Sequence, residues 1–377
     1  IKSGTGGISD YAFYNCAILQ SISGLNYVEH IGKGAFYGCT SLNSVTLNRN
    51  LTEIKEYTFY KCYSLFRVNI PVSLKKIGRS AFFKCIVLDE IDLSRCELEV
   101  IEDYSFYYCY NMHKVKLCDS LTKIGGNAFY NCSAITEIEI PDNVKTLGER
   151  AFAKCSLLEN LKIGPSVSLI GNYAFSDCSS LKSLSLPDSV KEIGDYSFYH
   201  CDNLKSIDLG KGLEKIGEYS FYGLEQIQSV IIPPSVRTIG SFAFKGMKNV
   251  TSVILNQNIE EIGSHAFYDY DGMTIYSDAE SRKAEWSEIF NSSFRPVVWS
   301  CVLSEDKTYV LSVRIGENSI SYAHAINGIT APYREGFTFK GWALSDDTLE
   351  TAYTAENITE APVGTTLYAV WIINDIE

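Results

Sequence analysis

Residues 170–193 read IGNYAFSDCSSLKSLSLPDSVKEI, and this stretch contains every feature of a unit that recurs along the chain. Its phenylalanine is one of twelve that follow one another every 23 residues, with one interval of 24 between Phe82 and Phe106. Such a period predicts stacked repeats, because a unit this short has an apolar face that only its neighbours can bury. The twelve are Phe13, Phe36, Phe59, Phe82, Phe106, Phe129, Phe152, Phe175, Phe198, Phe221, Phe244 and Phe267.

The residues around each phenylalanine keep their types from repeat to repeat. An aliphatic residue stands five positions before it, a glycine four positions before it in nine of the twelve repeats, and a small residue directly before it. We expect the glycine to mark a backbone bend. Further on, Leu184 and Leu186 alternate with polar residues, which is the pattern of a half-buried strand. We therefore expect one parallel strand per repeat, with the extra residue of the longer interval lying in the turn between Leu93 and Leu98.

The unit, written I-x-L-P-x-x-V-x-x-I-G-x-x-A-F-x-x-C, resembles the leucine-rich repeat of the BspA-like, Treponema-type class from residue 8 to about 276. This resemblance implies a solenoid with a parallel β-sheet joined by short turns or 3-10 segments. The residues between Thr274 and Trp299 resemble the C-terminal cap of such arrays. We expect the solenoid to occupy residues 1–300, with the cap at about 277–300. Because Ile1 lies almost at the first repeat, we also expect the chain to be a fragment.

The last part of the chain has a different pattern. The segments REGFTFKGW (334–342) and LYAVW (367–371) resemble the Listeria–Bacteroides repeat, a small β-grasp-like module of bacterial surface proteins. The resemblance implies a small α+β domain over residues 301–377, which we expect to fold independently of the solenoid. Members of both families are surface proteins, so the two resemblances together imply a secreted or cell-surface protein of a bacterial envelope.

Composition and motifs exclude several classes of function. The chain has 33 basic and 45 acidic residues and a net charge of −12, which disfavours nucleic acid or an anionic membrane as a partner. No apolar run reaches the roughly 20 residues of a membrane span. The five histidines form no H-E-x-x-H motif, and the sequence has no phosphate-binding loop or G-x-S-x-G elbow. We predict a monomeric protein without catalytic site, cofactor, metal or membrane insertion.

Nine of the twelve cysteines stand three positions after the repeat phenylalanine, from Cys16 to Cys201. The last three repeats have Leu224, Met247 and Tyr270 at this position. Because the position accepts apolar side chains, we predict that these cysteines are buried structural thiols and not metal ligands. Cys96 and Cys118 lie outside this ladder, in the turns after two successive strands, and whether they form a disulfide stays open.

Two surfaces are candidates for contact with a partner. The outward position eight residues after the phenylalanine alternates in charge, which is typical either of cross-strand salt bridges or of specific recognition. Two positions further on, Ile231 and Ile254 replace charged residues, and apolar side chains on a nominally exposed face require a partner, either the following module or another protein. Tyrosines also recur directly after the phenylalanine and two residues before it, where they are expected to stack between repeats or to bind glycans.

The third to fifth repeats combine bulk and charge on the strand face. Phe66 stands in a column of otherwise polar residues and is surrounded in the repeat by Arg67, Glu90, His113 and Lys114. An exposed aromatic residue among charges has the composition of a binding hot spot. The alternative is that the Phe66 side chain folds onto the neighbouring repeat.

These patterns favour a non-enzymatic adhesion or protein-interaction scaffold on a bacterial surface. Solenoids offer a broad concave face to extended partners, so we expect a host extracellular-matrix or surface protein to bind on the concave sheet. Two alternatives stay open: a glycan-binding module that uses the tyrosines, or a passive spacer within a larger secreted or wall-attached protein.

Overall fold

The computed structural model describes residues 1–228, 230–270, 272–293, 297–299, 301–303, 310–315, 318–321, 337–343, 350–352, 354 and 368–373. Its backbone contacts divide the chain into two compact units, Ile1–Leu204 and Lys205–Glu377. In both units the repeats form successive coils of a parallel solenoid, as the sequence predicted.

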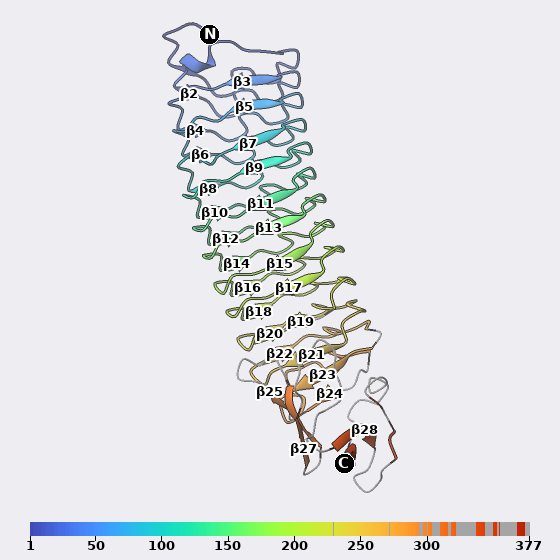
Figure 1. Ribbon diagram of the computed structural model, residues 1–377. Coiled ribbons are helices and arrows are strands. Elements are labelled where there is room, and N and C mark those ends of the chain that lie inside the picture. Colours follow the sequence, from blue (N-terminus) through green and yellow to red (C-terminus); the bar gives the residue numbers. More distant parts are fainter. Residues whose placement is uncertain are drawn as a thin grey trace. The chain divides into compact units, whose positions relative to one another are not determined.

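Each coil of the first unit contributes to two rows of strands, whereas the sequence indicated only one (Figure 1). The first row lies directly before the repeat glycine and consists of β1 (Gly7–Ile8), β2 (His30–Ile31), β4 (Glu53–Ile54), β6 (Lys76–Ile77), β8 (Val100–Ile101), β10 (Lys123–Ile124), β12 (Thr146–Leu147), β14 (Leu169–Ile170) and β16 (Glu192–Ile193). The second row is the predicted I-x-L row and consists of β3 (Ser44–Thr46), β5 (Arg67–Asn69), β7 (Glu90–Asp92), β9 (Lys114–Lys116), β11 (Glu137–Glu139), β13 (Asn160–Lys162) and β15 (Ser183–Ser185).

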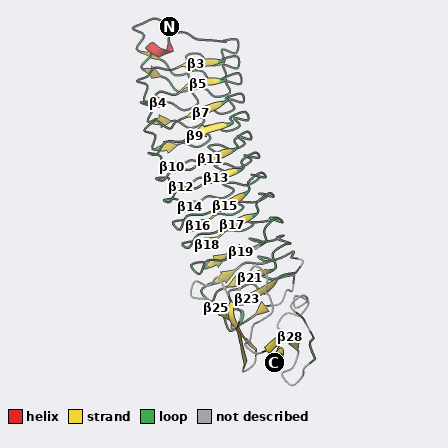
Figure 2. Ribbon diagram, in the orientation of Figure 1, coloured by secondary structure: helices red, strands yellow, loops and turns green. Residues whose placement is uncertain are grey.

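Both rows are parallel and in register from coil to coil. In the first row Lys123 lies opposite Thr146 and Ile124 opposite Leu147, so equivalent residues of successive repeats meet. Side chains alternate between the two faces of a strand, and the aliphatic residue of each pair is the buried one. Turns connect the rows, and the only helix in the described part of the chain is the short 3-10 helix η1 (Leu25–Tyr27) (Figure 2).

The segment around each phenylalanine forms a third ladder of hydrogen bonds between coils. In one coil the backbone N–H groups of Tyr104, Phe106 and Tyr108 donate to carbonyl oxygens of the next coil at 2.8–2.9 Å. Tyr104 and Tyr108 have left-handed backbones, with φ of 59° and 60°. A left-handed residue costs about 1–2 kcal/mol. We infer that the hydrogen bonds between coils offset this strain, because the N–H groups of both left-handed residues donate to the next coil.

The repeat glycines lie where each first-row strand ends and a turn begins, but a left-handed backbone is not what requires glycine there. None of them has a positive φ among the described residues. Instead, a Cβ atom built on Gly148 would lie 2.5 Å from the backbone nitrogen of Gly126 in the preceding coil. The glycine is needed because adjacent coils approach each other too closely for a side chain at this point.

The core of the first unit is the column of phenylalanines. Apart from Phe13 in the first coil, these side chains are fully buried. Each ring stacks on the next with 5.1–5.5 Å between ring centroids. Such offset stacking adds to the stabilisation from burial, so the phenylalanine column stabilises the contact between successive coils.

The second unit also contains two rows of strands. Its first row is β18 (Lys215–Ile216), β20 (Thr238–Ile239) and β22 (Glu261–Ile262), and its second is β17 (Ser206–Asp208), β19 (Val230–Ile231), β21 (Ser252–Leu255), β23 (Thr274–Ser277) and β24 (Val297–Val298). The antiparallel strands that follow are β25 (Cys301–Leu303), β26 (Val310–Ile315) and β27 (Asn318–Ser321), then the pair β28 (Phe337–Ala343) and β29 (Tyr368–Ile373).

The segment expected to cap the array packs on the last coil of the second unit. Trp286 is fully buried, and its indole nitrogen donates to the carbonyl of Ile259 at 3.2 Å. The N–H of Phe267 donates to the carbonyl of Phe290, as it would to a further coil. The proposed boundary at residue 300 falls between β24 and β25. It stays a prediction, because most of residues 301–377, including any helix of the module, lie outside the described residues.

The cysteine ladder has a role that the sequence did not indicate. Eight of its nine thiols are buried, and each lies 3.0–3.4 Å from the carbonyl oxygen of the phenylalanine in the preceding coil, to which it donates. The hydroxyl of Tyr270, at the same repeat position, donates to the carbonyl of Phe244 at 2.8 Å. The position therefore suits a buried hydrogen-bond donor. Cys16, in the first coil, is exposed, and Cys96 and Cys118 are buried and free.

Replacing Cys155 with alanine should lower the free energy of unfolding by about 1–2 kcal/mol, because it removes buried volume and leaves the carbonyl of Phe129 without its donor. Cys155→Ser, which keeps a donor, is the matched control. Burial raises the pKa of the Cys155 thiol to about 12, so it should resist thiol reagents at neutral pH. Titration of the native protein should label Cys16 alone of the ladder, and labelling of the interior thiols before unfolding would contradict this structure.

Candidate binding surface

The five residues selected by sequence lie together on the outer face of the second strand row, at β5, β7 and β9. We call them the sheet-face patch: Phe66, Arg67, Glu90, His113 and Lys114. All five side chains are exposed, and Phe66 retains 49% of its surface. Glu90 and Lys114 are directly opposite each other in the register of β7 and β9.

Phe66 is held at the surface by its backbone. Its N–H donates to the carbonyl of Asn43 at 2.9 Å, and its own carbonyl accepts from the N–H of Asp89 at 3.2 Å. The guanidinium of Arg67 lies 5.7 Å from the centre of the phenyl ring, within the range of a cation–π contact. The backbone ladder thus fixes an aromatic ring and a cation side by side on an open face.

The charges of the patch are not neutralised by the cross-strand salt bridges that the sequence offered as one interpretation. No ion pair joins Arg67, Glu90 or Lys114 to another described residue. The ion pairs lie in the flanking columns, where Lys116 meets Asp92 at 3.3 Å and His113 meets Asp89 at 3.0 Å. The central column therefore presents charges of both signs to the solvent.

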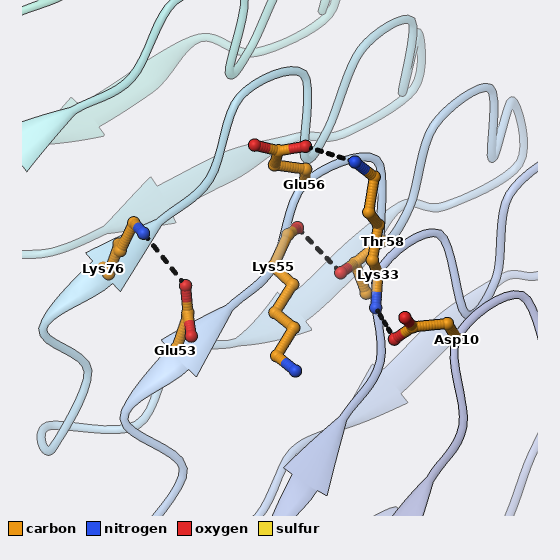
Figure 3. A network of polar contacts seen from close by, with 7 residues as sticks. All are labelled: Asp10, Lys33, Glu53, Lys55, Glu56, Thr58 and Lys76. Carbon is orange, nitrogen blue, oxygen red and sulfur yellow. Dashed lines mark hydrogen bonds and ion pairs between the residues drawn. The ribbon is translucent and has the colours of Figure 1, made fainter.

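Elsewhere on the first unit, exposed charges pair between successive coils (Figure 3). The ammonium of Lys33 contacts the carboxylate of Glu56 at 2.7 Å, and Lys76 contacts Glu53 at 3.2 Å. The hydrogen bond between Lys33 and Glu56 raises the pKa of the lysine and lowers that of the glutamate. Since these groups are exposed, their contribution to stability is small. They show that the spacing between coils allows ion pairs to form. The unpaired state of Arg67, Glu90 and Lys114 is therefore a property of these positions and not of the coil spacing.

A depression of about 440 Å³ lies beside the patch. Its walls include Arg67 and Glu90 from the strands, Val72 and Arg95 from the turns that follow them, and Asp92. Arg95 belongs to the turn with the extra residue of the 24-residue repeat. Sequence reasoning located that insertion but did not select Arg95 or Val72. The only available signal was the insertion itself, next to an unusual aromatic residue.

The two isoleucines proposed for the second unit differ in exposure. Ile231 in β19 is 47% exposed, as expected. Ile254 in β21 is 2% exposed, so its assignment to an open face was wrong. All four residues of β21 and of β23 are buried, and Ile254 lies opposite Tyr276. Burial raises the pKa of Tyr276, with a further contribution from Cys301 at the start of β25. The chain itself covers this part of the sheet.

The tyrosine stripe is packed between coils, and stacking is thereby confirmed. Tyr14, Tyr37, Tyr60, Phe83, Tyr107 and Tyr130 form a continuous column with 4.5–5.0 Å between successive ring centroids. Burial raises the pKa of Tyr107 above its usual value. Because each ring covers the face of the next, interior rings offer their edges to a sugar and not their faces.

Among the described residues, no three histidine, cysteine, aspartate or glutamate side chains converge as metal ligands would. The part of the chain that the structure describes also has no helix whose length and apolar character would suit a bilayer.

Stacked parallel coils with an aliphatic and phenylalanine core define a leucine-rich-repeat solenoid. The family model of the BspA type leucine rich repeat region matches residues 6–133, 95–205 and 168–294, and the chain belongs to this family. The Listeria-Bacteroides repeat domain matches residues 308–370. Proteins of these families are repeat proteins that are typically not enzymes.

Solved structures of bacterial leucine-rich-repeat proteins are similar to the chain. A leucine-rich repeat protein from Bacteroides ovatus is 23% identical over 71% of this chain and 82% of its own, with a TM-score of 0.46. A leucine rich cell surface protein from Faecalibacterium prausnitzii is 27% identical over 72% and 83%, also with a TM-score of 0.46. The T. pallidum leucine rich repeat protein is 28% identical over 49% and 77%, with a TM-score of 0.38. No curated protein matches the chain.

Proposed function

We propose that the chain is a non-enzymatic adhesion scaffold of a bacterial surface, which binds an extended protein partner along the outer face of its second strand row. Both matched families are typical of bacterial surface proteins. The observation that carries the proposal is the sheet-face patch, in which a half-exposed Phe66 stands beside Arg67, Glu90 and Lys114, three charged residues that have no ion-pair partner in the described part of the chain.

The physical case rests on preorganisation. Arginine is enriched in binding hot spots and phenylalanine in the cores of interfaces, and the backbone ladder holds Phe66 and Arg67 in place before a partner arrives. A partner that crosses β5, β7 and β9 meets Arg67, Glu90 and Lys114 at successive coils, so their alternating charges define a register. Unpaired charges make such a register selective, because a misplaced partner would set like charges against each other.

The test is solid-phase binding of the purified chain to a panel of immobilised host extracellular-matrix proteins. For any protein that is captured, Phe66→Ala and Arg67→Glu should each weaken binding about tenfold or more, the effect of losing a hot-spot contact. Lys123→Glu, which makes the same charge change at an exposed position of β10 in the other strand row, should bind as the unchanged chain does.

Three outcomes would count against the proposal. Unchanged capture by both patch variants, with melting curves that show an intact fold, would remove the patch from the binding surface. Capture of no protein at all would favour the spacer alternative, and saccharide binding that depends on the tyrosines would favour the glycan-binding alternative.

A further inference from the structure

The depression beside the patch is built by a rigid turn. Asp92 accepts hydrogen bonds from the backbone N–H of Ser94 at 3.0 Å and from its hydroxyl at 2.6 Å. The N–H of Cys96 donates to the carbonyl of Leu93 at 2.9 Å, and its thiol lies 3.5 Å from the carbonyl of Pro71. The inserted turn is therefore fixed at both ends, and Arg95 projects from a defined backbone position.

The charge balance of the depression favours an anion. Asp92 is satisfied by Ser94 and by Lys116, and the hydrogen bonds from Ser94, with Lys116 adding, hold the pKa of its carboxyl below the usual value. The remaining charged groups of the lining are two guanidinium groups, Arg67 and Arg95, and one carboxylate, Glu90. Neither arginine has an ion-pair partner among the residues that the structure describes. When Lys116, the partner of Asp92, is counted, three cationic groups stand at the depression against two carboxylates, which is a local excess of one positive charge in a chain of net charge −12.

The same depression has an apolar edge. Val72 is 58% exposed, which is high for an aliphatic side chain beside a solenoid core, and Ile70 next to it is half-buried. A ligand that fits this wall combines one negative group with small aliphatic groups. Glu90 and Asp92 in the wall would repel a ligand with many closely spaced negative charges, such as a sulfated polysaccharide.

We propose that this depression is a recognition subsite for a glutamate or aspartate side chain of an extended peptide, flanked by aliphatic residues, with Arg67 and Arg95 as its cationic groups. The inference rests on the proposed function, since it names the segment of the protein partner that the patch selects. A side chain supplies the carboxylate, and not a chain terminus, because a partner that crosses several coils passes the depression in mid-chain. Guanidinium groups bind carboxylates through paired, charge-assisted hydrogen bonds.

The experiment uses blocked peptides and the full chain. The probe is acetyl-Thr-Val-Glu-Val-Thr-amide, and the comparison peptides are its glutamine version, the glutamine version with a free carboxyl end, and a heparin oligosaccharide. We expect the glutamate peptide to bind about tenfold or more tightly than the blocked glutamine peptide. Arg95→Gln and Arg67→Gln should each abolish that preference. Arg49→Gln should keep it, because Arg49 is exposed thirteen residues after its repeat phenylalanine, as Arg95 is, but does not line the depression.

The outcomes of this experiment test the subsite, the kind of carboxylate that it binds and the proposed function separately. Equal binding of the glutamate and glutamine peptides, or an Arg95→Gln variant that keeps the preference with an intact fold, would overturn the subsite. Stronger binding of the free carboxyl end or of heparin would overturn the choice of a side-chain carboxylate. If matrix proteins are captured through Phe66 while the peptide preference is absent, the proposed function stands and the subsite fails. If the glutamate peptide is preferred but no matrix protein is captured, the subsite stands and the proposed function fails.

Discussion

Replacing Phe129 with alanine should lower the free energy of unfolding by about 3–5 kcal/mol, the usual loss for a large buried aromatic side chain. Phe129 is fully buried and stacks on Phe106 at 5.2 Å and on Phe152 at 5.1 Å. In a linear array each coil is stabilised mainly by its two neighbours, so a cavity at Phe129 weakens two contacts between coils at once. Denaturant unfolding followed by circular dichroism measures the effect.

The matched control is Phe13→Ala. Phe13 is only half-buried and stacks on one neighbour, Phe36, at 5.2 Å, so its removal should cost clearly less than the removal of Phe129. Equal losses at the two positions would show that stability does not depend on stacking from both sides. A Phe129→Ala variant as stable as the unchanged chain would show that the phenylalanine column is not the core.

The coil and its register could be predicted because one residue type recurs at a fixed interval, and equivalent residues of a stacked array must meet. The first strand row could not be predicted in the same way. Its strands, such as β10, have two residues each, and alternation over two residues is not a pattern. The left-handed positions also gave no signal, because tyrosine, asparagine, lysine and histidine occupy them as well as glycine.

The candidate surface could be predicted where it follows the repeat pattern, but not where it depends on contacts outside that pattern. Phe66 could be selected because it interrupts a column of polar residues, and its exposure follows from the strand register. Ile254 is buried opposite Tyr276 in β23, and Tyr276 is in turn close to Cys301, which comes 47 residues after Ile254 and lies outside the repeats. The place of Arg95 depends on how hydrogen bonds fold the inserted turn. A repeat pattern gives no information about contacts with residues outside the repeats or about the fold of an inserted turn.

Replacing Gly125 with alanine should cost about 3 kcal/mol, at the upper end of the range for overpacking. A Cβ atom there would lie 2.7 Å from the backbone nitrogen of Asp103 and 2.8 Å from the carbonyl carbon of Glu102. These are backbone atoms of the preceding coil, so the two coils would have to separate. Thermal or denaturant unfolding of the variant measures the loss.

The adjacent Gly126 provides the control, since its Cβ would have no atom closer than 3.4 Å. Equivalent positions in other repeats hold large residues, among them Lys33, Glu56 and Glu149. Gly126→Ala should therefore be neutral or stabilise the fold by up to about 1 kcal/mol, because alanine restricts the unfolded chain. Lys55 and Glu102 stand where Gly125 does in two other coils. If Gly125→Ala proved as harmless as Gly126→Ala, the spacing between coils would be adjustable at every repeat, and the close approach would not be what selects glycine.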